Sequence, residues 1–214
     1  MVIINKPIEG SATKVESGRR ERKRSATRER LFRCAMHLFA ERGFFDTTVE
    51  DITRAADVGK GTFFNYFPSK DHIIGVFAEI QLSKANAAFA EASAGSENIR
   101  EVLHRLFRRV AEEPSRSRAL ARSLLTALVG SPAVRTIVTD AMANGRELLA
   151  NTFRLGQARK QVRADLDPAV MALHFQQCFF GALAVWAMQE RGRIQPQIEM
   201  SFSTFWTGVA AEKD

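Results

Sequence analysis

The spacing of apolar residues along the chain predicts helices throughout the sequence after residue 25. Leu31, Ala35 and Leu38 recur at intervals of four and three residues, which places them on one face of a helix that Gly43 ends. Further helices are predicted near 69–92, 96–112, 116–129, 131–156 and 167–192, with a last one from Pro196. No segment alternates polar and apolar residues as a half-buried strand does, so the pattern predicts an all-α fold.

Start and stop signals divide the N-terminal part into three short helices. Thr47 and Glu50 have the spacing of a capping box, so a second helix is expected to open at Thr47. Residues 55–59 predict a tight turn, and a short aromatic helix is expected over 60–67 because Pro68 stops it. Ser69 is expected to cap the following helix. Three short helices with a turn before the third form a helix-turn-helix pattern.

Charge is concentrated in the first third of the chain. The formal net charge is +7 over 214 residues, and residues 1–70 carry 14 Lys and Arg against nine Asp and Glu. Residues 1–24 lack helical periodicity, contain the basic run from Arg19 to Arg24, and are predicted to form a disordered basic arm. This balance favours a polyanionic partner, but it does not choose among nucleic acid, an anionic membrane and an acidic protein.

The remaining composition predicts a cytoplasmic protein without metal or membrane contact. Cys34 and Cys178 lie far apart and have no zinc-like spacing, so two reduced thiols and no metal site are expected. No signal peptide is recognised at the N-terminus. The longest uncharged stretch contains polar residues, and its purely apolar part, 178–188, is shorter than the ~20 residues of a membrane span. A buried helix is expected there.

The third short helix has the chemistry that a DNA major groove requires. Small residues at its tip allow close approach, a lysine supplies charge, and an asparagine presents the paired donor and acceptor that suit an adenine edge. Threonines at the start of the second helix and a lysine after the third are candidates for phosphate contacts. The predicted DNA-binding residues are Thr47, Thr48, Lys60, Gly61, Thr62, Asn65, Tyr66 and Lys70.

Residues 26–73 resemble the DNA-binding domain of the TetR/AcrR family. The resemblance rests on segments 35–39, 43–44, 47–52, 58–67 and 69–71. Their spacing along the chain matches the family pattern without a gap. It implies an all-α dimeric regulator, with a DNA-binding domain over 25–70 and a helical ligand-binding and dimerisation domain over 71–214. Two positions depart from the family pattern, which usually has Ser where Gly59 stands and Tyr where Phe64 stands. Phe64 cannot donate to a phosphate, so that role is not transferred to it.

Several of these side chains have a structural alternative to DNA contact. Phe63 and Phe67 are expected to pack the small domain's core, because they lie four residues apart on one helix face. Thr47 could serve both as a cap and as a phosphate contact, and Asn65 could read a base or remain solvated. The basic arm could be a solubilising tail, or it could follow phosphates or enter the minor groove.

The C-terminal region is predicted to bind a ligand and a second copy of the chain. Residues 169–188 are apolar on more than one face, so one face is expected to meet the chain's own core and another the partner subunit. The predicted dimer residues are Phe179, Phe180, Leu183, Phe202, Phe205 and Trp206. The predicted ligand-binding residues are His104, Phe107, Leu124, Met142, Phe153, Phe175, Cys178 and Trp186. Scarce buried charge favours an apolar or amphipathic ligand.

The function that the sequence favours is a sequence-specific transcriptional regulator, namely a repressor that a small molecule releases from double-stranded operator DNA. An enzyme is disfavoured, because the four histidines are scattered and no GxSxG, HExxH or P-loop motif occurs. No catalytic residue and no cofactor are therefore predicted. A nonspecific architectural protein remains an alternative, and it would bind DNA of any sequence with a steep salt dependence. Activation instead of repression also stays open, since promoter geometry decides it.

Overall fold

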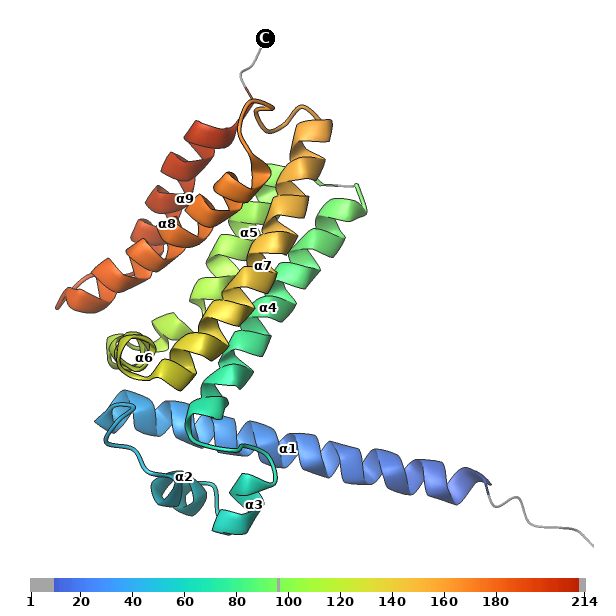
Figure 1. The fold of residues 1–214 in the computed structure, drawn as a ribbon, viewed down its shortest axis with the longest axis vertical. Coiled ribbons are helices and arrows are strands. Elements are labelled where there is room, and N and C mark those ends of the chain that lie inside the picture. The colour runs from blue at the N-terminus through green and yellow to red at the C-terminus, as the bar shows by residue number, and fades with distance from the viewer. Residues whose placement is uncertain (1–9, 96, 212–214) are drawn as a thin grey trace, which may run out of the picture.

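The structure is a computed structural model that describes residues 10–95 and 97–211, and in this range the predicted all-α class is confirmed. No strand occurs there beyond the isolated bridge between Val162 and Ala210. The N-terminal helices are the long α1 (Gly10–Arg42) and the short α2 (Val49–Ala55) and α3 (Lys60–Phe64). The remaining elements are α4 (Asp71–Ser93), α5 (Ile99–Ala111), the 3₁₀ turn Pro114–Arg116, α6 (Arg118–Gly130), α7 (Pro132–Ala158), α8 (Pro168–Met188) and α9 (Gln195–Val209). In Figure 1, α4 to α9 form a bundle, and α2 and α3 lie on the opposite side of α1.

The first helix starts much earlier than the apolar pattern predicted. We expected a disordered arm over residues 1–24, but α1 includes every residue from Gly10, and residues 1–9 lie outside the described range. No proline interrupts 10–42, and most of its residues are good helix formers, so the helix can continue without an apolar face. Figure 1 shows this segment extending beyond the rest of the molecule.

The cap of α2 also differs from the prediction. Its N-cap is Thr48, whose hydroxyl accepts from the Asp51 N–H at 3.1 Å, while the Asp51 carboxylate accepts from the Thr48 N–H at 3.1 Å. The Thr48 side chain is also the main cause of the lowered pKa of Asp51. Thr47 cannot be the cap, because its buried hydroxyl donates to the Gly43 carbonyl at 2.7 Å. The capping box therefore exists, but one residue later than predicted.

The start of α4 is held by a hydrogen bond to another helix rather than by the predicted Ser69 cap. The N-cap position is Lys70, which makes no side-chain cap bond, and the Ser69 hydroxyl donates to Asp71 at 3.1 Å. The other Asp71 oxygen accepts from the hydroxyl of Ser131 at 2.7 Å. Ser131 is in turn the N-cap of α7, as predicted, with Pro132 at the first helical position. Asp71 therefore ties the starts of α4 and α7 together.

Buried apolar side chains form two cores that α4 and α7 share. The first core lies between α1, α2 and α3 and continues into α4 at Ile74, into α6 at Leu120 and into α7 at Val134. The second core fills the bundle between α5, α7, α8 and α9 and includes Ala92 of α4 and Phe153 of α7. Because α4 and α7 reach both cores, they connect the small helices to the bundle mechanically.

Gly156 marks a tight contact inside the second core. A Cβ atom at this position would stand 2.6 Å from Cγ2 of Val162 and 3.3 Å from Cγ2 of Ile99. We expect Gly156→Ala to lower the free energy of unfolding by about 1–3 kcal/mol, because a stiff buried valine must move. Gly75→Ala in α4 is the matched control, since its nearest atom is 3.7 Å away.

The control variant should instead gain about 0.5–1 kcal/mol, because alanine favours the helix over glycine. Denaturant unfolding of both variants measures these changes. Equal gains in both proteins would contradict the close packing at Gly156.

Candidate nucleic-acid interface and ligand cavity

The exposed face of α3 rests on two aromatic side chains that are buried beneath it. Phe63 and Phe67 pack with ring centroids 5.5 Å apart in the first core, as expected from their spacing. Gly61 and Asn65 are exposed on the other side, and Thr62 is half-buried. The α2–α3 pair lies at the end of the molecule farthest from α8 and α9 (Figure 1). This face can therefore approach a large partner without obstruction from the bundle.

Lys60 and Glu50 form an exposed ion pair between α3 and α2. The hydrogen bond from the Lys60 ammonium is the main cause of the lowered pKa of Glu50. Such exposed pairs contribute only ~0–1 kcal/mol, so the lysine can exchange the carboxylate for another anion.

The neighbouring residues at the end of α3 differ in how far their side chains are exposed. Asn65 follows the last turn of α3 as its C-cap and is exposed. Tyr66 is half-buried because its ring packs against the first core. Phe64 is 48% exposed, with its ring edge against Phe63. An exposed phenylalanine at this place can make apolar contacts but cannot donate a hydrogen bond.

Two of the residues that were predicted to contact phosphate instead make contacts inside the protein. The Lys70 ammonium donates to the carbonyl oxygens of Phe44 at 2.6 Å and Thr47 at 2.8 Å, and it lies 4.4 Å from the centre of the Phe44 ring. Burial lowers the pKa of Lys70. Thr47 is fully buried. Both residues hold the loop between α1 and α2, so the structure corrects their assignment as side-chain contacts to DNA.

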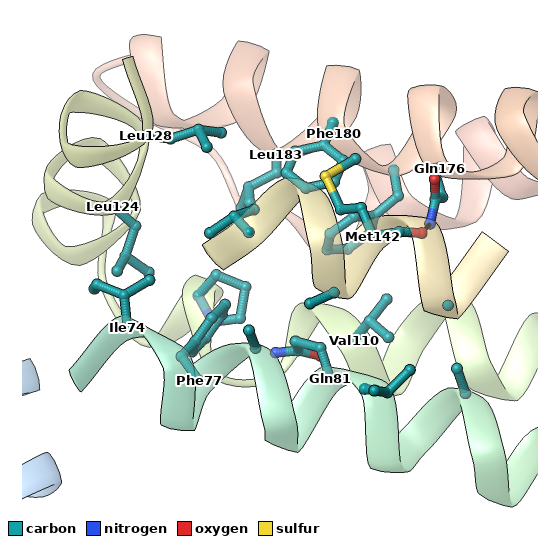
Figure 2. A pocket seen from close by; sticks show the side chains of 18 of the residues that line it. Ile74, Phe77, Gln81, Val110, Leu124, Leu128, Met142, Gln176, Phe180 and Leu183 are labelled. Atoms are coloured by element: carbon teal, nitrogen blue, oxygen red, sulfur yellow. Dashed lines mark hydrogen bonds between the residues drawn. The ribbon is translucent and has the colours of Figure 1, made fainter. Parts of the chain in front are cut away.

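A cavity of about 160 Å³ lies between α4, α5, α6, α7 and α8 (Figure 2). Three of the predicted ligand residues, Leu124, Met142 and Phe175, line it. All its other lining side chains are apolar except two amides, Gln81 and Gln176. The cavity therefore offers an apolar ligand a site with very few polar partners.

The other predicted ligand residues do not line the cavity. Phe107 and Phe153 are fully buried in the second core. His104 pairs with Glu199 of α9, and the Trp186 indole donates to the Gly192 carbonyl at 3.2 Å. Cys178 packs against the second core, where burial raises the pKa of its thiol. Helical periodicity predicts which positions face inward, but it does not show which of them border an empty space.

Three of the predicted dimer residues are buried within the single chain, and the other three are half-buried. Leu183, Phe202 and Phe205 are buried in the chain's own second core, and Phe179 and Trp206 pack partly against it. Phe180 lines the cavity. The exposed apolar side chains of α8 and α9 are instead Val170, Leu173, Val185, Met188 and Met200. We call these five residues the outer face.

α8 is uncharged along its whole length. Among the described residues it is the one helix long and apolar enough to cross a membrane by length and hydropathy, and a third of its most apolar window is buried within the chain. A helix that has both a core face and an outer apolar face meets the same criterion.

Comparisons with known proteins agree with this geometry. A family model described as "Bacterial regulatory proteins, tetR family" matches residues 31–75. The HTH-type transcriptional regulator TcmR of Streptomyces glaucescens is 36% identical over 93 residues, which cover 44% of this chain and 41% of TcmR.

Solved structures match over nearly the whole chain. A putative TetR-family regulator from Syntrophomonas wolfei has a TM-score of 0.72 at 20% identity, covering 86% of this chain and 94% of that one. The Thermus thermophilus repressor FadR, solved with lauroyl-CoA, has a TM-score of 0.63 at 28% identity, covering 87% and 97%. The fold and the exposed α2–α3 face are those of helix-turn-helix transcriptional regulators. Residues 31–75 match the tetR family of bacterial regulatory proteins, and the described chain has the fold of solved TetR-family regulators.

The internal role of Lys70 can be separated from a surface role by stability. Lys70→Met should lower the free energy of unfolding by about 1.5–3 kcal/mol, because buried carbonyls lose a charged donor. Lys60→Met is the matched control and should change it by less than about 0.5 kcal/mol, since its ion pair is exposed. Urea unfolding of both variants makes the comparison. Similar small changes in the two would restore a surface role for Lys70.

Proposed function

We propose that this protein is a cytoplasmic, dimeric repressor that a small, largely apolar ligand releases from its operator. In this proposal residues 25–70 bind DNA, while residues 71–214 hold the ligand and the dimer contact. The exposed face of α3 carries the DNA-binding part, and the apolar cavity next to the first core carries the ligand-responsive part.

The DNA contacts are assigned to residues that the structure leaves accessible. The tip of α3 offers Gly61 and Thr62 for close approach to the major groove, and Asn65 as a base reader. Lys60 contacts phosphate after leaving Glu50, and Thr48 places the start of α2 near the backbone. The hydroxyl of Tyr66 supplies a further phosphate donor.

The ligand response follows from residues shared between the cavity and the first core. Ile74 of α4 and Val134 of α7 belong to that core and also line the cavity. A ligand that displaces them would move the support beneath α1, α2 and α3. It would release DNA only if it binds the non-DNA-binding arrangement more tightly. The lauroyl-CoA complex of the related FadR supports a ligand with a large apolar part.

Dimerisation is assigned to the outer face. Its five apolar side chains are 38–72% exposed in the single chain, which is unusual for large residues clustered on two adjacent helices. Gly181 of α8 has no atom within 4 Å of an added Cβ, so a partner helix could approach closely there. The repressor would then present two α3 helices to half-sites ~34 Å apart.

Selection of bound fragments from the source genome, with purified protein at physiological salt, tests the DNA-binding proposal. We expect a short palindrome upstream of genes, because two symmetric subunits read two half-sites. Fragments without a common sequence would support the architectural alternative and overturn the proposal.

Substitutions on α3 should separate phosphate contacts from base reading. Lys60→Ala should weaken binding to all sequences and reduce the slope of log affinity against log salt by about 1. Tyr66→Phe should also weaken all sequences, and it keeps the ring packing that Tyr66→Ala would lose. Asn65→Ala should relax the preference for one base pair by about 1–3 kcal/mol. Titrations against the operator and single-base variants measure this, and equal losses on every sequence would reject base reading by Asn65.

A charge on the outer face should break the dimer. Wild-type protein is expected at twice the 23.9 kDa chain mass in sedimentation equilibrium. Val185→Arg should raise the dimer dissociation constant by about a hundredfold or more, because an unpaired buried charge costs about 3–5 kcal/mol. Val129→Arg, at a 77% exposed site on α6, is the matched control and should remain dimeric. A monomeric wild type, or a dimeric Val185→Arg, would remove the outer face from the proposal.

A further inference from the structure

The two amides that line the cavity have different hydrogen-bonding states. Figure 2 shows Gln81 on α4 and Gln176 on α8, on separate sides of the cavity. The Gln176 amide nitrogen donates to the Met142 carbonyl at 2.8 Å, and its oxygen accepts from Arg146 at 3.2 Å. Both ends of Gln176 are therefore engaged in joining α8 to α7.

Gln81 has a partner only on its nitrogen side. Its Nε2 donates to the carboxylate of Glu113 at 3.2 Å. Because a carboxylate only accepts, it determines which end of the amide faces Glu113 and leaves Oε1 on the other side. Oε1 is fully buried and has no hydrogen-bond donor among the described protein residues. An unpaired buried carbonyl is unfavourable, so it attracts a donor.

The cation nearest in the network cannot supply that donor. Lys84 is one turn along α4, but its ammonium is bound to the Glu113 carboxylate and to the carbonyl of Arg109. Lys84 and Glu113 are both largely buried, with side chains 14% and 20% exposed, so the pair is held in place. It fixes the position of Glu113 and, through it, the orientation of the Gln81 amide.

A water molecule is a poor substitute as the donor. Buried waters make about three hydrogen bonds, whereas the only polar side chains lining this cavity are Gln81 and the already engaged Gln176. A ligand can bring a donor and fill the apolar space at the same time. No charged side chain lines the cavity, so an ionised group placed there would lack a counter-charge.

We propose that the cavity selects a neutral ligand with an apolar body and one hydrogen-bond donor, such as a phenolic or alcoholic hydroxyl, which donates to Oε1 of Gln81. The volume of about 160 Å³ is close to the ~150 Å³ of a cavity known to accept benzene, so a single ring is the smallest body that fills it. This inference rests on the proposed function, in that it assigns the effector to this cavity.

Phenol and toluene are suitable probes, because they have the same number of heavy atoms and differ in the donor. Isothermal titration calorimetry of the full chain should show that wild type binds both. Gln81→Met, which keeps the side-chain length but removes the oxygen, should leave toluene binding unchanged or tighter. It should weaken phenol relative to toluene by about tenfold, as expected for one lost hydrogen bond and an unpaired hydroxyl. Benzoate, which carries a charge, should bind neither protein.

Gln176→Met is the matched control, since its amide already has internal partners, and it should leave the phenol-to-toluene ratio at the wild-type value. An unchanged ratio in Gln81→Met, or failure of wild type to bind phenol, would overturn the inference. Operator binding measured without ligand is a separate readout. Sequence-specific operator binding together with an unchanged ratio would leave the repressor proposal standing and reject only the role of Gln81.

Discussion

The packing of α4 against α7 supports both the bundle and the short helices α2 and α3. Both helices enter both hydrophobic cores, and the Asp71–Ser131 hydrogen bond aligns their first turns. The DNA-facing helices have little core of their own, because α2 and α3 are only seven and five residues long. Helices this short are unstable in isolation, so their geometry follows from what lies beneath them. In the proposed mechanism, a change at the α4–α7 contact would be transmitted to α2 and α3.

The loop between α1 and α2 shows how this support is completed. Its backbone carbonyls at Phe44 and Thr47 lie outside the helices. The ammonium of Lys70, at the start of α4, donates hydrogen bonds to both of them. The same side chain lies over the Phe44 ring, which is buried in the first core. A partly buried lysine is costly unless it is well partnered, and here its partners are the loop that positions α2. Electrostatics and apolar packing thus stabilise the same few residues.

The bundle combines two kinds of apolar surface that differ in what can cover them. The cavity lies between five helices and has the size for a small molecule, whereas the outer face lies on α8 and α9 and can be covered by a second chain. The proposed ligand and dimer contacts therefore share α8 and lie close together on it. Phe180 and Leu183 line the cavity, while Val185 belongs to the outer face. A ligand in the cavity would reach both the dimer contact and the support of α3 through neighbouring residues.

Features that depend on neighbours along the chain could be predicted from the sequence alone. The Ser131–Pro132 and Asp167–Pro168 starts lie where they were predicted, and Gly43 ends α1 with a φ of +92°. The helix-turn-helix pattern and the family resemblance were readable for the same reason. These signals are caps, stops and helical spacing, which act over a few residues.

Which face of each helix meets which partner depends on contacts between segments that are far apart in the chain. α8 is apolar all round, so its sequence could not tell the core side with Leu183 from the outer side with Val185. In the sequence Lys70 resembles a surface cation, because the Thr47 carbonyl that it binds lies 23 residues away in the chain. Gln81 carried no signal in the sequence, since a buried orphan oxygen exists only once its surroundings are known. The burial of a residue depends on neighbours that are distant in the chain, and a local sequence pattern does not reveal those neighbours.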